Sequence, residues 1–178
     1  MQSYLNELSK KAKQGNMKID LVHSDMRRIN FDSQFDACGN LWTSFGFFEK
    51  ESDNRFVVKK MYQALKPGGR FMLHVINRDW VVVNLQVHDW HDLGGVKTLE
   101  ERQFDYRTSI NHGTWRFIKD GIEKKIYSPI RLYSFHELIA IFESIGFVDI
   151  EGYGSEKQEP ITRNSRMMFI IGTKPRRG

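Results

Sequence analysis

The residues best suited to chemistry by type and spacing are His88, His91 and Asp92, which lie within five positions beside Trp90. Imidazole and carboxylate groups are common metal ligands, but this stretch offers no further strong ligand at a fixed spacing. We therefore expect no metal site. A histidine can also serve as a general base, so His88 and His91 are candidate catalytic residues in a segment whose composition is that of a polar linker.

Arg131, Tyr133 and Asn40 form a second set of candidates, for binding rather than proton transfer. A guanidinium can clamp a substrate carboxylate through two parallel hydrogen bonds, although an arginine here is equally typical of a hairpin surface. The Asn40 amide can bond a ligand or close a turn at the end of an apolar segment. The nearby phenylalanines wall a pocket or belong to the core: Phe45, Phe47 and Phe48.

Alternating strands and helices must position these side chains. Apolar patterns predict strands at 19–23, 35–41 and 70–77 and helices at 3–14 and from about 53 to 65. The strand at 35–41 is a nearly continuous run of small and apolar residues, which is typical of a strand covered on both faces. This order of elements predicts an α/β fold with a parallel sheet.

The second half of the chain predicts antiparallel structure. Aromatic and β-branched runs between 98 and 133 are separated by Asn111-His-Gly113 and Asp120-Gly121, which are hairpin signals, so we expect an insert of about three strands. Ser134 and Glu137 form a capping box at the start of a helix that ends at Gly146. The last two strands, 147–153 and 167–173, have no helix between them and should pair antiparallel.

Seven short motifs follow one another in a fixed order: Asp25-Met-Arg27, Phe35-Asp36, Asn40-Leu-Trp-Thr-Ser-Phe-Gly46, Leu65-Lys-Pro-Gly-Gly69, Arg131-Leu-Tyr-Ser-Phe-His-Glu-Leu138, Gly146-Phe147 and Lys174-Pro175. In this order the chain resembles the class I S-adenosylmethionine-dependent methyltransferases that modify small molecules. The resemblance covers nearly the whole length, as one partial methyltransferase domain over 1–178. It implies a Rossmann-like sheet with an antiparallel final strand and with 98–133 as a substrate cover.

The resemblance also implies roles for particular residues, with S-adenosylmethionine as the cofactor and a small molecule as the methyl acceptor. Asp25 and Met26 would meet the adenine, although Asp25 is also typical of an Asx turn. Asn40 and Leu41 would lie near the cofactor's amino acid end. The residues implied for the substrate are Trp42, Phe45, Arg131 and Tyr133.

Two parts of the family pattern have no counterpart: the glycine-rich loop after strand one and the acidic residue ending strand two. We therefore expect an N-terminally truncated chain whose sheet lacks strands one and two. The open edge would favour self-association or a partner chain. The alternative function is an inactive remnant, or a binding subunit that depends on its partner and does not bind the cofactor alone.

Composition limits the remaining choices. The net charge of +5 is spread among acidic residues over 178 positions, so a nucleic-acid partner is not expected, although an accessory part of a nucleic-acid methyltransferase is compatible with it. The sequence contains neither a long apolar segment nor a signal peptide. Cys38 is the single cysteine, which is compatible with a cytoplasmic protein.

Overall fold

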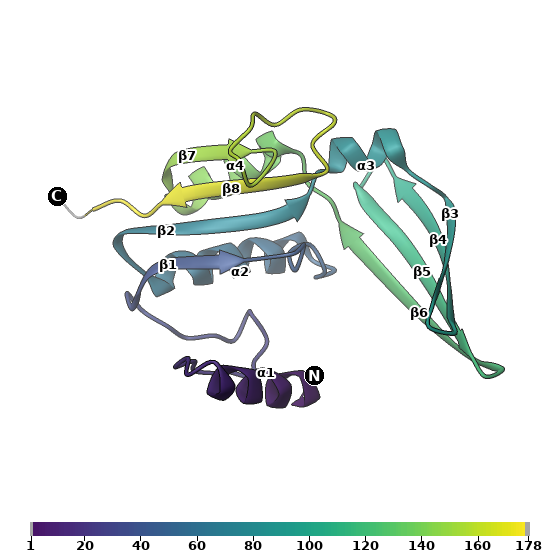
Figure 1. Ribbon diagram of the computed structural model, residues 1–178. Coiled ribbons are helices and arrows are strands. Elements are labelled where there is room, and N and C mark those ends of the chain that lie inside the picture. Colours follow the sequence, from purple (N-terminus) through teal and green to yellow (C-terminus); the bar gives the residue numbers. More distant parts are fainter. Residues whose placement is uncertain (1, 177–178) are drawn as a thin grey trace.

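A computed structural model describes residues 2–176, which form two four-stranded sheets and four helices (Figure 1). The helices are α1 Gln2–Gln14, α2 Glu51–Ala64, α3 Arg78–Asn84 and α4 Phe135–Ile145. Sheet A has the strand order β1 Phe35–Asn40, β2 Leu65–Ile76, β8 Met167–Thr173 and β7 Val148–Tyr153. Sheet B has the order β3 His88–Leu93, β4 Val96–Asp105, β5 Ile110–Lys119 and β6 Ile122–Arg131.

Sheet A is the mixed sheet of an α/β fold. β1 pairs parallel with β2, and β8 lies antiparallel between β2 and β7. Alternate residues of β2 and β8 point toward α2 and α4, where Phe71 stacks on Phe142 at 5.4 Å between ring centroids. The predicted fold class, including the antiparallel final strand, is therefore confirmed.

Helix α4 follows the local rules on which it was predicted. Ser134 accepts a hydrogen bond from the Glu137 N–H while the Glu137 carboxylate accepts one from the Ser134 N–H at 2.9 Å, which completes the capping box. Leu138, Ile141 and Phe142 are buried. Gly146 ends the helix in the left-handed conformation, with φ of 106°.

The predicted strand at 19–23 is wrong. Residues 19–23 form no ladder, and Ile19, Leu21 and Val22 are exposed. A strand needs a neighbour to satisfy its backbone groups, and none of the described strands lies beside this segment. Figure 1 shows α1 and the chain that follows it set apart from the helix-covered part of sheet A.

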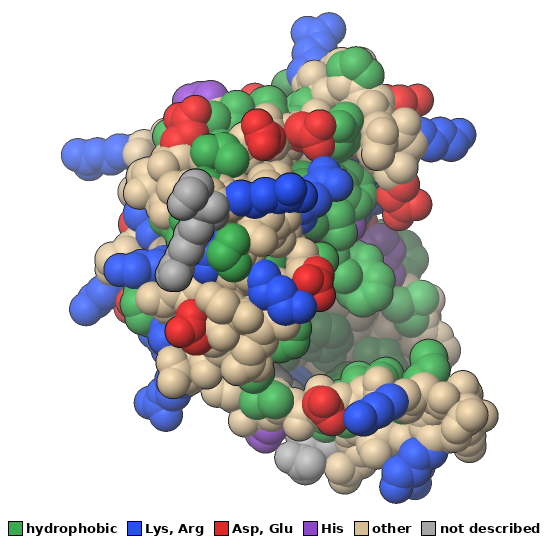
Figure 2. Space-filling model, turned by 90° about the vertical axis from the view of Figure 1, so that its left-hand side faces the viewer, with side chains coloured by type: hydrophobic (Ala, Val, Ile, Leu, Met, Phe, Trp, Pro, Cys, Tyr) green, Lys and Arg blue, Asp and Glu red, His purple; other side chains and the backbone are tan. Residues whose placement is uncertain are grey.

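The expectation that 35–41 is covered on both faces is also wrong. β1 is an edge strand whose residues are mostly exposed, and only Asn40 is buried. A space-filling view shows a hollow lined with hydrophobic side chains between the lower part of the molecule, which contains α1, and the body above it (Figure 2).

Sheet B is larger than the predicted three-stranded insert because the predicted linker is a strand. His88 and His91 lie in β3, which pairs antiparallel with β4. Asn111-His-Gly113 lies within β5 rather than in a turn, and the β4–β5 turn falls at 106–109. The turn at Asp120-Gly121 is where the sequence predicts it, with positive φ at both residues.

Sheet B stands at the end of sheet A toward which β1 and β2 point (Figure 1). Val81 of α3, Phe104 and Leu132 form a small second core where the two parts join. In an open α/β sheet, ligands bind beyond the carboxyl ends of the parallel strands. The antiparallel sheet therefore adjoins the edge at which a ligand is expected.

In the described part of the chain, no helix is long and apolar enough to span a membrane.

Candidate functional site

Asn40 ends β1 with a buried side chain that is only half satisfied. It is 5% exposed, and its Nδ2 lies 3.5 Å from the Met26 sulfur as a hydrogen-bond donor. Its Oδ1 is buried and has no hydrogen-bond partner among residues 2–176. A buried acceptor without a donor is costly, so this carbonyl oxygen suits an N–H or O–H group of a ligand.

Asp25 precedes Met26, the residue that this amide contacts, in a turn that Arg27 holds in place. The Asp25 carboxylate accepts hydrogen bonds from the Arg27 N–H at 2.9 Å and from the Arg27 guanidinium at 2.7 Å. These bonds lower the pKa of Asp25 to about 2. The structure thus contains the Asx turn, and Asp25 offers a carboxylate that is ionised at neutral pH.

Arg27 connects this turn to the loop after β1. Its guanidinium also donates to Asp53 at 2.8 Å and lies 4.3 Å from the centroid of the Phe48 ring. The Asn54 side chain donates to the Phe48 carbonyl at 3.2 Å, which fixes the same loop to α2. The loop is therefore held from two sides, although it carries little regular structure.

Leu41, which was implied for the cofactor, and Trp42, which was implied for the substrate, lie apart from the other residues of their sets. Trp42 is 82% exposed, with φ of 52°, and its N–H donates to Nδ1 of His74 at 3.4 Å. Both residues line a cavity of about 390 Å³ on the face of sheet A opposite α2 and α4, beside His74 and Phe169. Burial lowers the pKa of His74, which stacks on Phe169 at 4.2 Å between ring centroids.

Phe45 and Tyr133 belong to the core. Their rings lie 5.1 Å apart, and each is 2% exposed. The Tyr133 hydroxyl donates to Glu51 at 2.8 Å. Burial and the neighbouring Glu51 carboxylate raise the pKa of Tyr133. Neither ring lines a described cavity, so both lie beneath the site rather than in it.

Arg131 does line a cavity, but its guanidinium is already paired. It bonds the Glu137 carboxylate and the Leu132 carbonyl, and it lies 4.5 Å from the centroid of the Tyr133 ring. These bonds use two of the five N–H groups of the guanidinium, and Glu137 already balances its charge. The arrangement does not support the predicted carboxylate clamp.

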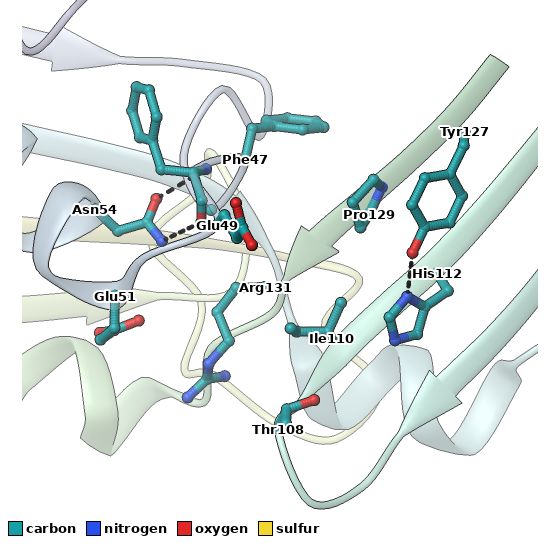
Figure 3. A pocket seen from close by; sticks show the side chains of 12 residues that line it. Phe47, Glu49, Glu51, Asn54, Thr108, Ile110, His112, Tyr127, Pro129 and Arg131 are labelled. Atoms are coloured by element: carbon teal, nitrogen blue, oxygen red, sulfur yellow. Dashed lines mark hydrogen bonds between the residues drawn. The ribbon is translucent and has the colours of Figure 1, made fainter.

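The cavity next to Arg131 opens between the two sheets and has a volume of about 640 Å³. We call it the inter-sheet cavity (Figure 3). Its lining is Gly46, Phe47, Phe48, Glu49, Glu51, Asn54, Thr108, Ile110, His112, Tyr127, Pro129 and Arg131. One wall is the loop after β1 with the start of α2, and the other is the inner face of β5 and β6.

Gly46 joins these two walls. Its carbonyl accepts a hydrogen bond from the Arg131 N–H at 2.8 Å, and its φ is 101°. A Cβ at this position would clash with the Arg131 carbonyl oxygen. Only glycine fits both the backbone angle and this close approach.

His112 and Tyr127 are cavity residues that sequence reasoning missed. Nδ1 of His112 and the Tyr127 hydroxyl are 2.6 Å apart (Figure 3). The Asn111-His-Gly113 triplet predicts a turn, whereas the structure has His112 on the inner face of β5. The alternation of aromatic and polar residues at Trp115, Arg116 and Phe117 was the signal that could have shown the strand.

His88 and His91 do not act together. Three residues apart in β3, they point to opposite faces of sheet B. Neither lines the inter-sheet cavity, and Nε2 of His91 lies 3.3 Å from Asp89. No group of three candidate metal-ligating side chains occurs in the part of the chain that the structure describes.

Residues 2–90, half of the chain, match the model of the ubiE/COQ5 methyltransferase family. None of the curated proteins compared with the chain matches it in sequence.

Solved structures share the fold at low sequence identity. An S-adenosylmethionine-dependent methyltransferase from Clostridium acetobutylicum is 16% identical, with a TM-score of 0.77 over 98% of this chain and 72% of that one. The CcbJ methyltransferase from Streptomyces caelestis is 13% identical, with a TM-score of 0.80 over 96% of this chain and 70% of that one. A sugar N-methyltransferase from a Streptoalloteichus species is 15% identical, with a TM-score of 0.64 over 93% of this chain and 66% of that one.

Proposed function

The chain belongs to the ubiE/COQ5 methyltransferase family, and we propose that it transfers a methyl group to a small molecule bound in the inter-sheet cavity. The cofactor is S-adenosylmethionine. When bound, it supplies a methyl group on a positively charged sulfur, ready for attack by a nucleophile. The chain's own residues then have to bind, orient and shield the reactants.

The residues around the end of β1 fit this cofactor. The buried Asn40 Oδ1 lacks a donor in the described chain, and the cofactor carries amino and hydroxyl groups that can donate to it. Asp25 adds an ionised carboxylate and Met26 a backbone N–H close by. We therefore propose Asp25, Met26 and Asn40 as the residues that hold it; Leu41, the fourth residue expected there, lines the cavity on the opposite face of sheet A.

The inter-sheet cavity is the observation that carries the proposal of a small-molecule acceptor. Its volume of about 640 Å³ lies within the range of small-ligand sites. Its lining includes the loop that follows the carboxyl end of β1, and it combines apolar side chains with a few polar groups. Here Arg131 forms part of the wall, and Phe45 and Tyr133 support that wall from below.

The charges of the cavity favour a neutral or cationic acceptor. Arg131 is paired with Glu137, whereas Glu49 and Glu51 are exposed at the cavity wall. An anionic acceptor would meet the Glu49 carboxylate, a Glu51 carboxylate that is itself paired with Arg55 at 3.5 Å, and an Arg131 guanidinium that is already paired. A sugar N-methyltransferase shares the fold of this chain, and an amino sugar is an acceptor of this class.

Methyl transfer of this kind depends mainly on alignment. Holding nucleophile and methyl group in line can lower the barrier by roughly 7–11 kcal/mol. The loop fixed by Arg27, Asn54 and Gly46 provides a stiff wall for that purpose, and the facing strands of sheet B restrict access of water.

The test is methyl transfer from S-adenosylmethionine to a set of amines, phenols and carboxylic acids, followed as S-adenosylhomocysteine release. We expect turnover of at least one amine or phenol and of no acid. Ile110→Trp, which fills the cavity, should abolish turnover. Ile118→Trp, on the same face of β5 but outside the cavity lining, should leave turnover unchanged. No turnover with any acceptor, or full activity of Ile110→Trp, would refute the proposal.

A second candidate function rests on the outer edge of β1. This strand pairs only with β2 among the described strands, and Phe35 and Leu41 are exposed along it. Such an edge can pair with another strand, as in a subunit that depends on its partner. Sedimentation at high concentration should then reveal association that Ala37→Lys reduces; a strict monomer would exclude self-pairing.

A further inference from the structure

His112 and Tyr127 form the most closely coupled polar pair on the wall of the inter-sheet cavity. They occupy diagonal positions on neighbouring strands, since His112 is opposite Pro129 and Tyr127 is opposite Thr114. Their rings are nearly parallel, at 9°, with centroids 6.1 Å apart. This arrangement fixes the orientation of the imidazole as well as its position.

Only one ring nitrogen of His112 is engaged. Nδ1 meets the Tyr127 hydroxyl at 2.6 Å, whereas Nε2 has no hydrogen-bond partner within residues 2–176. Figure 3 shows this second nitrogen on the side of the ring turned away from Tyr127. When Nδ1 carries the proton and donates it to the phenol oxygen, Nε2 is an acceptor available to a molecule in the cavity.

The groups around the His112 ring that carry charge are three carboxylates and one paired guanidinium. Asp105 faces it from the end of β4, and hydrogen bonds from Thr108 and from the Arg107 N–H lower the pKa of Asp105. Glu49 and Glu51 line the opposite wall. Arg131, on the same strand as Tyr127, is neutralised by Glu137.

We infer that His112 is a catalytic residue that takes the proton of a hydroxyl or amine acceptor in the inter-sheet cavity, with Tyr127 as its positioning residue. This inference rests on the proposed function. The acceptor's lone pair forms the bond to the methyl carbon, and the carbon–sulfur bond breaks with its electron pair left on sulfur. The proton that the acceptor loses passes to Nε2 of His112 and from there to water.

Fragment binding tests this role without the cofactor. Phenol and anisole differ only by the methyl group, and phenol alone can donate a hydrogen bond to Nε2. The wild-type chain should bind phenol about three- to tenfold more tightly than anisole, as one hydrogen bond allows. In His112→Phe that preference should disappear. His88→Phe, on the same face of sheet B but outside the cavity, should keep it.

Nitrogen-15 spectra of the imidazole test the role of Tyr127. In the wild-type chain the His112 signals should indicate a proton on Nδ1, and Tyr127→Phe should move them toward the other tautomer in a folded protein. Equal binding of the two fragments, binding of neither, or a preference that persists in His112→Phe would overturn the inference. Turnover that His112→Phe leaves unchanged would overturn it too, while the proposed function would stand.

Discussion

Asp25 shows how one residue can serve both the loop and a ligand. Its carboxylate is held by the backbone and side chain of Arg27, and this guanidinium also reaches Asp53. A carboxylate has further lone pairs, so an additional donor can still be accepted. The Asx turn therefore does not prevent Asp25 from accepting a hydrogen bond from the adenine, as proposed.

The first prediction concerns the titration of Asp25. Its pKa of about 2 should rise toward the ordinary value of 3.8 in Arg27→Gln, because the side-chain hydrogen bonds are lost. Because the pKa of Asp25 is lower in the folded state, the ionised carboxylate stabilises the folded state above pH 3.8. This stabilisation is lost as the pH falls toward 2. Carbon-13 spectra of the side-chain carboxyl would measure both values. An unchanged midpoint in the variant would contradict the assigned cause.

The second prediction concerns Tyr133, whose pKa is raised by burial and by Glu51. The folded state holds this proton more tightly than the unfolded state. The contribution of the protonated hydroxyl to the free energy of unfolding is therefore complete below pH 10.0 and is lost as the pH rises above that value. Above that pH the wild-type free energy of unfolding should fall by about 1.4 kcal/mol per pH unit more than that of Tyr133→Phe.

At neutral pH, Tyr133→Phe should cost about 1 kcal/mol for its lost hydrogen bond to Glu51. Denaturant unfolding of both proteins between pH 7 and 11 gives the comparison. Parallel pH curves for the two proteins would show that Tyr133 titrates normally.

At the scale of elements, the site depends on the loop after β1 meeting the end of β6. The contact is a single backbone hydrogen bond between Gly46 and Arg131, with no room for a side chain. The same contact closes one end of the inter-sheet cavity.

The third prediction separates backbone strain from this close approach. Gly121, in the β5–β6 turn, also has positive φ, but nothing lies within 4 Å of a Cβ built there. Gly121→Ala should cost about 1–2 kcal/mol, the strain of the left-handed conformation. Gly46→Ala should cost clearly more, because the loop must move away from Arg131. Equal losses in urea unfolding would mean that the contact adds nothing.

Elements fixed by local chemistry could be predicted from the sequence. Ser134, Glu137 and Gly146 define both ends of α4 through bonds within a few residues, and the structure has them where expected. The strand predicted at 19–23 is wrong because a strand forms only beside a neighbouring strand. The local sequence pattern does not show whether such a neighbour exists. β3 was missed because its exposed side chains, His88 and His91 among them, give no apolar alternation.

The site was less predictable than the fold. Asn40 was identified at the end of its strand, but the pairing of Arg131 with Glu137 joins the end of β6 to the first turn of α4 and depends on how the chain turns between them. His112 and Tyr127 are fifteen positions apart and become neighbours only through the register of β5 and β6. Contacts of this kind follow from tertiary structure alone.

At the scale of the whole molecule, sheet A supplies the edge for the cofactor and sheet B faces it across the inter-sheet cavity. β1, which ends in Asn40, is at once the outermost strand of sheet A and the centre of the proposed site. The chain spans 72% and 70% of two methyltransferases that share its fold. The proposed function therefore requires that these 178 residues bind the cofactor.

The most direct measurement is a calorimetric titration of the purified chain with S-adenosylhomocysteine. We predict saturable binding in the micromolar range, weakened about tenfold in Asn40→Leu, which keeps the side-chain size but removes the buried acceptor. Ser52→Leu, at an exposed position of α2, should bind as the wild type does. Absence of heat from folded wild-type protein, or equal affinity of Asn40→Leu, would contradict the proposed cofactor site.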